Sequence, residues 1–208
     1  MWCQKSRIKW LKEGDRNTNF FHCLANGRRK VNFIGGVTFD GEVCSDPISI
    51  RRGIYNFFKN HFKKKGWKRP SMRGGAIKKL SEGEREALEL PFSAEEVWVA
   101  LSSCDGNKAP GPDGFNMNFI KANWGVIQQD FMNFINEFYN DGSIVKDLNN
   151  SFIVLIPKIG NPTSMRDFRP ISLIRSMYKV LAKVLANRMK KVKSSVIGVS
   201  QMAFVKNR

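Results

Sequence analysis

The chain has 208 residues and a formal net charge of +17, because 35 lysines and arginines outnumber 18 aspartates and glutamates. Hydrophobic residues make up 42% and aromatic residues 12% of the sequence, which is enough for a packed core and excludes wholesale disorder. No apolar run approaches the roughly 18 residues that cross a bilayer, and the first residues lack an apolar signal core. We therefore expect an intracellular protein without membrane contact.

The cysteines and histidines do not form a metal-binding pattern. The four cysteines contain no C-x-x-C pair, and His22 and His61 are the two histidines. We expect no zinc site, and thiols without disulfide partners in a reducing compartment. The cysteines are Cys3, Cys23, Cys44 and Cys104.

Positive charge concentrates toward both ends of the sequence. Residues 1–80 carry 19 basic and 5 acidic side chains, residues 81–165 carry 5 and 12, and residues 166–208 carry 11 and 1. Lysine and arginine neutralise phosphates and release counterions, so a nucleic acid is the expected partner. A merely solubilising surface charge is the alternative, which self-repulsion makes less attractive.

The first predicted elements are two helices. One is predicted over residues 6–13, and a second begins at Asn17 or Thr18 and ends at Gly27. Residues 28–30 (Arg-Arg-Lys) follow at once, and they either complement the helix dipole or contact phosphate.

A β-hairpin and a third helix are predicted next. Residues 32–44 alternate around an Asp-Gly turn at 40–41. Asp-Pro at 46–47 opens a helix that runs to about Phe62, with a broad apolar face that we expect to be core. That face comprises Ile48, Ile54, Tyr55, Phe57, Phe58 and Phe62.

Residues 63–79, KKKGWKRPSMRGGAIKK, hold eight basic residues and no acidic one. A proline and adjacent glycines block regular structure. We predict a basic linker that is either a tether on nucleic acid or a solvated connector; a nuclear-localisation signal is a further alternative. It divides the chain into an N-terminal helical and hairpin extension, residues 1–62, and a second region, residues 80–208.

The second region begins with two helices and a loop. Capping-box patterns at 81–84 and 93–96 each predict a helix start. The loop 104–115, CDGNKAPGPDGF, precedes a helix that ends at 140–142, Asn-Asp-Gly. The apolar residues of that helix are Ile127, Phe131, Phe134, Ile135 and Phe138.

A strand and a long helix complete the predicted elements. Residues 151–157, SFIVLIP, predict a strand that needs partners. A loop is predicted from there to Pro170, and a helix over 176–192 has an apolar core face and basic outer faces that include Arg188. The expected fold class is α+β and predominantly helical, with low stability for the isolated chain.

No self-sufficient active site emerges from these residues. Neither histidine has a glycine elbow or a candidate nucleophile beside it, and no phosphate-binding G-x-x-x-x-G-K-[ST] loop occurs. Two-metal phosphoryl chemistry needs converging carboxylates, and the sequence has no Asp-Asp pair. These observations favour a basic nucleic-acid-binding protein.

Five segments in order resemble the reverse transcriptase of non-LTR, LINE-type retrotransposons, with a plant-like linker between endonuclease and polymerase at the N-terminus. They are SRIKWLKEGDRNTNFFH (6–22), NKAPGPDGF (107–115), FIVLIPKIGNP (152–162), DFRPISLIRSMYKVLAKVLANRM (167–189) and SQMAFVKNR (200–208). The resemblance covers nearly the whole chain. It implies a linker and fingers region, with the palm and its metal-binding aspartates expected beyond Arg208.

The resemblance further implies that the chain is a fragment of an RNA-directed DNA polymerase. The intact enzyme would bind an RNA template, a DNA primer, deoxynucleotide triphosphates and Mg²⁺, in the nucleus. The fragment would have no catalytic or metal-binding residue and no cofactor, and it would keep nucleic-acid affinity without turnover. The alternatives are a non-catalytic RNA- or DNA-binding relic, or a relic without function.

Site residues follow from the resemblance. Lys158 and Arg169 match cations that hold the incoming triphosphate; the alternative for Arg169 is an ion pair with Asp167 or a contact with the loop before the long helix. Lys108, Gly111 and the nearby Gly114 match a template-contacting loop, with turn formation as the alternative for the glycines. The segment that leads into the palm contributes Gln201, Phe204 and Arg208.

Overall fold

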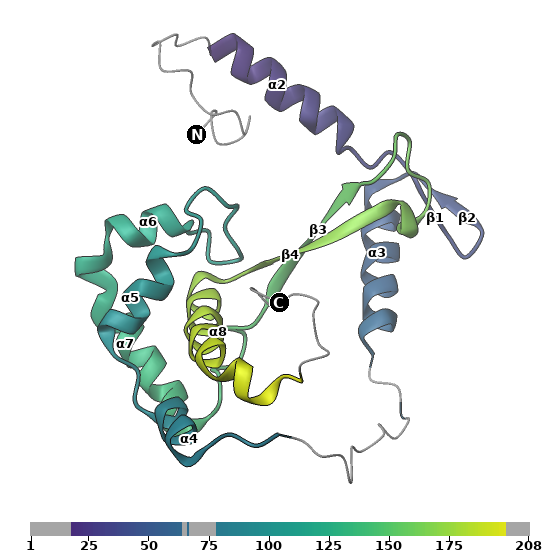
Figure 1. Cartoon of the computed structure of the whole chain (residues 1–208). Coiled ribbons are helices and arrows are strands. Elements are labelled where there is room, and N and C mark those ends of the chain that lie inside the picture. The colour runs from purple at the N-terminus through teal and green to yellow at the C-terminus, as the bar shows by residue number, and fades with distance from the viewer. Residues whose placement is uncertain (1–17, 64–65, 67–77, 199–208) are drawn as a thin grey trace. The chain divides into compact units, whose positions relative to one another are not determined.

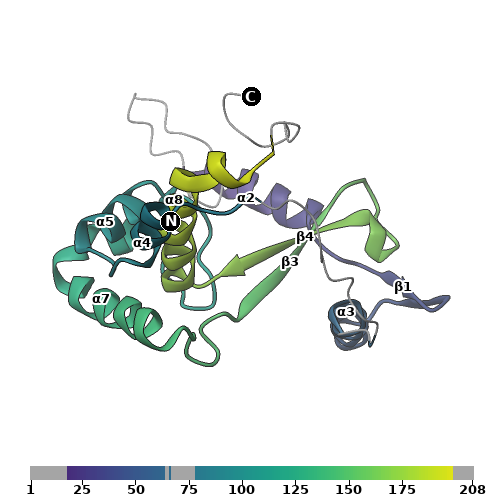
Figure 2. The same ribbon diagram turned by 60° about the horizontal axis from the view of Figure 1, so that its bottom comes forward.

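The computed structural model describes residues 18–63, 66 and 78–198, whose contacts divide into two units (Figures 1 and 2). We call residues 18–63 together with 153–172 the N-terminal unit, and residues 78–152 together with 173–198 the helical unit. The fold is α+β and mostly helical, as predicted. The predicted helix at 6–13 and most of the basic linker lie outside the described residues.

The N-terminal unit begins with a helix, a hairpin and a second helix: α2 (Thr18–Val31), β1 (Val37–Phe39), β2 (Glu42–Cys44) and α3 (Pro47–Phe62). The second predicted helix corresponds to α2, and the prediction that it ends at Gly27 is wrong. The following Arg-Arg-Lys residues are good helix formers and suit the negative end of the dipole, so they form its last turn.

The predicted hairpin and the start of α3 are confirmed. β1 and β2 are antiparallel, with Val37 opposite Cys44 and Phe39 opposite Glu42. Asp40 and Gly41 both have positive φ, 50° and 90°, which is the primed turn that fits the strand twist. The Asp46 carboxylate then accepts the Ile48 and Ser49 N–H groups and caps α3.

A second antiparallel ribbon pairs β3 (Ser151–Pro157) with β4 (Phe168–Ile174). The strand β3 was predicted, but the prediction of a loop up to Pro170 is wrong, because β4 begins at Phe168. A proline is tolerated there, since a two-stranded ribbon leaves one edge of each strand free of ladder hydrogen bonds. A short 3₁₀ helix, η1 (Met165–Asp167), ends the connection between the strands.

The N-terminal unit has a small core built from segments far apart in the sequence. Its buried members, Val37, Leu155, Met165 and Phe168, come from β1, β3, η1 and β4. Because residues 153–172 pack with the hairpin, they belong to the N-terminal unit and interrupt the helical one. A division by sequence order alone does not anticipate this grouping.

The expectation that the whole apolar face of α3 is core is wrong. Ile54 and Phe58 pack against the small core and Ile50 is buried. Ile48 and Phe62, however, are 75% and 70% exposed, and Tyr55 and Phe57 are also exposed. The hairpin and ribbon supply too little surface to cover a stripe as broad as this one.

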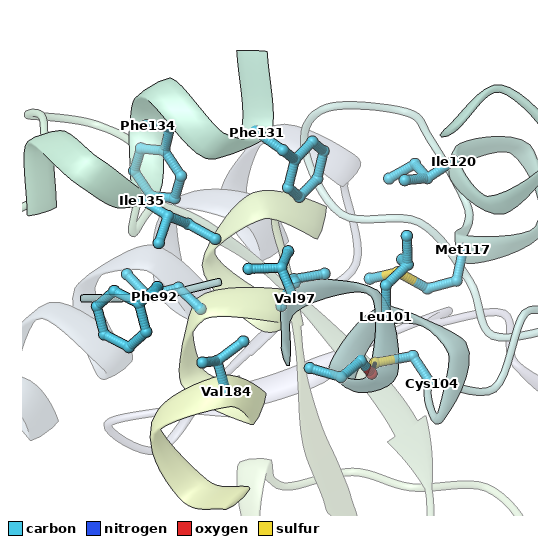
Figure 3. Packing of buried hydrophobic residues seen from close by; sticks show 13 residues of the cluster. Phe92, Val97, Leu101, Cys104, Met117, Ile120, Phe131, Phe134, Ile135 and Val184 are labelled. Atoms are coloured by element: carbon cyan, nitrogen blue, oxygen red, sulfur yellow. Dashed lines mark hydrogen bonds between the residues drawn. The ribbon is translucent and has the colours of Figure 1, made fainter. Parts of the chain in front are cut away.

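The helical unit contains five helices, and α8 makes its most extensive packing contact with α5. They are α4 (Glu82–Glu89), α5 (Ala94–Ser102), α6 (Met117–Ala122), α7 (Trp124–Asp141) and α8 (Ser176–Val196). Their apolar faces meet in one core, where Val97 and Leu101 of α5 lie close to Ile135 of α7 and Val184 of α8 (Figure 3). Gly142, in left-handed conformation, ends α7 as predicted.

Of the two predicted capping boxes, one is complete and the other is formed only in part. Ser81 and Glu84 form a complete box at the start of α4. At α5 the Ser93 hydroxyl accepts the Glu96 N–H, but the Glu96 carboxylate does not return to the cap. It binds Arg188 of α8 instead.

Arg188 is buried, although the sequence placed it on an outer basic face. Its Nε and Nη2 donate to the two Glu96 carboxylate oxygens, each at 2.8 Å. Nη1 donates to the carbonyls of Leu88 and Leu90, and Nη2 donates to that of Pro91. All five guanidinium N–H donors therefore have acceptors. The guanidinium also lies 4.0 Å from the ring centre of Phe92.

We predict that Arg188→Ala lowers the free energy of unfolding of the helical unit by about 3 kcal/mol or more, because it leaves Glu96 and three carbonyls without their donor. Urea unfolding followed by circular dichroism measures this. The exposed Lys190→Ala on the same helix is the matched control and should change stability by about 0.5 kcal/mol or less. Equal effects of the two substitutions would contradict the structural role of Arg188.

A pH-dependent contribution is expected from Glu84. A hydrogen bond from the Ser195 hydroxyl, followed by those from Ser81, lowers the pKa of its carboxyl below 4.5. A lowered pKa in the folded state stabilises the fold above the unfolded value, and this contribution is lost as the pH falls through the folded value. The stability difference between the wild type and Glu84→Gln should therefore shrink below pH 4.5 in acid titrations of unfolding. A pH-independent difference would contradict this.

Candidate nucleic-acid interface

The connection between β3 and β4 fixes the position of Lys158. The Lys158 N–H donates to the Asp167 carbonyl at 2.7 Å, and its Nζ donates to the Arg166 carbonyl at 2.7 Å. The ammonium group is therefore held on the ribbon and keeps further N–H donors for a ligand.

Asp167 is engaged by the backbone of the same connection. Its carboxylate accepts the N–H groups of Thr163 and Ser164, at 3.1 and 2.9 Å, and completes a capping box on η1. Within the described residues no ion pair joins Asp167 to Arg169, which is the pairing considered as an alternative. The Asp167 carboxylate therefore stabilises the turn before β4 through these hydrogen bonds.

Arg169 follows the buried Phe168 on β4 and is exposed. Because side chains alternate along a strand, Arg169 lies on the ribbon face opposite to Phe168. Lys158 directly follows β3 and is hydrogen-bonded to Asp167, which directly precedes β4, so Lys158 and Arg169 lie at the same end of the ribbon. That the two cations hold a triphosphate stays a prediction.

Lys108, the predicted template contact, is exposed in the loop between α5 and α6. Its Nζ lies 3.6 Å from an Asp105 carboxylate oxygen. The Asn107 N–H, and to a lesser extent Lys108, lowers the pKa of Asp105. A surface pair of this kind contributes little energy and leaves the ammonium accessible.

Gly111 and Gly114 of this loop are needed for its packing and its backbone conformation. A Cβ on Gly111 would lie 2.2 Å from the Ile174 carbonyl oxygen, so the loop can pack against the start of α8 only with glycine there. Gly114 has φ +74° and donates its N–H to the Gly111 carbonyl at 3.1 Å. The close approach of Gly111 is therefore to the chain itself; contact with a template phosphate stays a prediction.

Asp113 was not singled out from the sequence, yet it joins the loop to α8. Its Oδ2 accepts the Ser176 N–H at 2.6 Å, and the Ser176 hydroxyl donates to the Phe115 carbonyl at 2.9 Å. An acceptor 63 residues away thus takes the place of a local cap, because Arg175, at the N-cap position, makes no side-chain capping bond. No local sequence rule could have found this contact.

The other predictions concern three C-terminal residues, metal ligands, free thiols and membrane-spanning helices. Gln201, Phe204 and Arg208 lie outside the described residues. In the part of the chain that the structure describes, no group of three or more His, Cys, Asp or Glu side chains gathers as metal ligands, and Cys44 and Cys104 are free thiols. None of the described helices is long and apolar enough to span a bilayer.

Substitution of Gly111 tests the packing of the loop. Gly111→Ala should lower the free energy of unfolding of the helical unit by about 2 kcal/mol, because a backbone carbonyl cannot move aside as a flexible side chain can. In Gly125→Ala, the control in α7, the added Cβ meets nothing within 4 Å and should leave stability equal or slightly raised. Chemical denaturation compares the two, and an unaffected Gly111→Ala would refute the close packing.

No protein-family model matches the chain. Over 209 residues it is 28% identical to a transposon TX1 uncharacterized 149 kDa protein of Xenopus laevis, which covers 98% of this chain and 16% of that protein. Over 121 residues it is 27% identical to the RNA-directed DNA polymerase from mobile element jockey of Drosophila melanogaster, covering 56% of this chain and 13% of that protein. The chain therefore spans a minor part of the length of these curated relatives. It is homologous to proteins of mobile elements, one of which is an RNA-directed DNA polymerase.

Proposed function

We propose that the chain is a segment of the reverse transcriptase of a non-LTR, LINE-type retrotransposon and supplies nucleic-acid and nucleotide contacts of its fingers region. The observation that carries the proposal is the β3–β4 ribbon, where Lys158 and Arg169 present cations that no described carboxylate pairs with. The similarity to two mobile-element proteins supports the assignment to this class.

The chemistry of the ribbon suits a triphosphate or a nucleic-acid backbone. Arginine offers a planar fork for two phosphate oxygens, and a lysine with its carbon stem held in place offers a directed point charge. The net charge of +17 adds long-range attraction, and each neutralised phosphate releases counterions. In the parent enzyme the partners would be an RNA template, a DNA primer and deoxynucleotide triphosphates, in the nucleus.

We assign no catalytic residue to this chain. Polymerisation with two metal ions needs carboxylates that converge about 4 Å apart, and the described carboxylates do not gather in this way. The residues described here thus do not fit a Mg²⁺ site, and other parts of the parent protein would supply it. The chain alone is expected to bind nucleic acid without extending a primer.

Binding to a labelled DNA primer annealed to an RNA template tests the proposal. The logarithm of the association constant should fall steeply with the logarithm of salt concentration, and Arg169→Ala should reduce that slope by about one. Fluorescence anisotropy across a salt series measures both. Lys146→Ala, which removes an exposed lysine beside Asp147, is the control and should change the slope less.

Three results would contradict the proposal or a part of it. A salt-independent interaction would exclude phosphate contact as its basis. Magnesium-dependent primer extension by the purified chain would contradict the absence of catalytic residues. Steep binding that Arg169→Ala leaves unchanged would instead favour a relic that binds nucleic acid through other cations.

A further inference from the structure

A groove of about 830 Å³ lies within the N-terminal unit. One side is formed by residues 30–38, which run from the end of α2 into β1, with Val43 of β2. The other side is formed by residues 157–163, the start of the connection after β3. Apart from Lys158 and Thr163, none of its residues belongs to the interface described above.

The two sides of the groove are fixed to each other. The Thr38 N–H of β1 donates to the Thr163 carbonyl at 2.8 Å. Next to Thr38 in the sequence, Val37 packs with Leu155 and Phe168 in the small core. The Asp167 carboxylate holds the Thr163 N–H, so the connection has a defined conformation. The groove is therefore part of the folded unit.

The groove is positively charged. Lys30, in the last turn of α2, and Lys158 line it from opposite sides, and no aspartate or glutamate is among its lining residues. The described residues of the N-terminal unit carry ten basic and four acidic side chains. An anion is thus favoured over a cationic or neutral ligand.

The groove also exposes an aromatic ring. Phe33 is 71% exposed, and an added Cβ on Gly35 would lie 3.5 Å from the ring, so the ring rests against a backbone without a side chain. Three other apolar residues also line the groove: Val31, Val43 and Ile159. An exposed aromatic ring and two lysines that line one groove match the bases and phosphates of a nucleic-acid strand.

We propose that this groove binds a single strand of nucleic acid, with a base stacked on Phe33 and flanking phosphates bound by Lys30 and Lys158. A single strand is the fitting form, because bases inside a duplex are covered by their neighbours and cannot offer a face to the ring. The inference rests on the proposed function and extends it from the ribbon to a second contact, in which residues 30–36 take part.

Binding of fluorescent oligouridylate and oligothymidylate to the full chain tests this groove. Phe33→Ala and Phe33→Leu should each weaken binding of both strands by about fivefold or more, because leucine keeps an apolar side chain but cannot stack. Phe33→Trp should restore or strengthen it. Phe62→Ala, which removes an equally exposed ring of α3 outside the groove, is the matched control and should bind as the wild type does.

The lysines give a second readout. Lys30→Ala should reduce the salt slope of single-strand binding by about 0.7, the value for one phosphate contact on a single strand. Circular dichroism should show each variant folded, and Phe33→Leu serves where alanine perturbs the fold. Wild-type affinity in both Phe33→Leu and Lys30→Ala would overturn the groove proposal.

The two proposals fail in different ways. If the wild type binds the primer–template through Arg169 while the Phe33 and Lys30 variants change nothing, the groove proposal alone is overturned. If the wild type binds neither duplex nor single strand, the proposed function is overturned and the groove proposal with it.

Discussion

The buried guanidinium of Arg188 is the interaction on which the helical unit depends. It reaches from α8 to the segment between α4 and α5 and satisfies three carbonyls that would otherwise lack donors. Because Glu96 supplies a carboxylate in two-pronged geometry, the charge is compensated where it is buried. Among the described helices α8 carries the most basic residues; one of them, Arg188, has a structural role, and the exposed lysines stay available for solvent or a polyanion.

The start of α8 is set by a second long-range device. Asp113 supplies the missing cap, and Gly111 lets the loop reach the backbone of residues 174–175. Since Ile174 is the last residue of β4 and Ser176 the first of α8, the loop containing Lys108 is anchored where the chain passes from this strand into the helix. Structural use of the glycines and a nearby nucleic-acid contact are compatible, because Lys108 itself points to solvent.

The sequence predicted correctly those features that depend on residues a few positions apart. The Asp-Gly turn, the Ser81 capping box and Gly142 each act within a few residues and are present as expected. The strand β4 escaped prediction because Pro170 is typical of loops and its partner strand decides its conformation. Arg188 was assigned to the surface because charge alone cannot indicate a partner 92 residues away.

The candidate site shows the same division. Lys158 and Arg169 could be named from the sequence through a family resemblance, but their position at one end of the ribbon depends on strand pairing. The groove beside Phe33 could not be found, because it needs residues 30–36 and 157–163 to meet through the Thr38–Thr163 hydrogen bond. The prediction that the whole apolar face of α3 is core failed, because periodicity shows which side chains share a face. It does not show whether another part of the protein covers that face.

We propose that the N-terminal unit contacts nucleic acid through the ribbon and the groove of the same unit. Hydrogen exchange followed by mass spectrometry can test this on the full chain, with and without a primer–template that carries a single-stranded template overhang. We expect slower exchange over residues 30–38 and 157–169 on binding, with α7 unchanged. Protection confined to the helical unit, or no protection despite saturating binding, would contradict it.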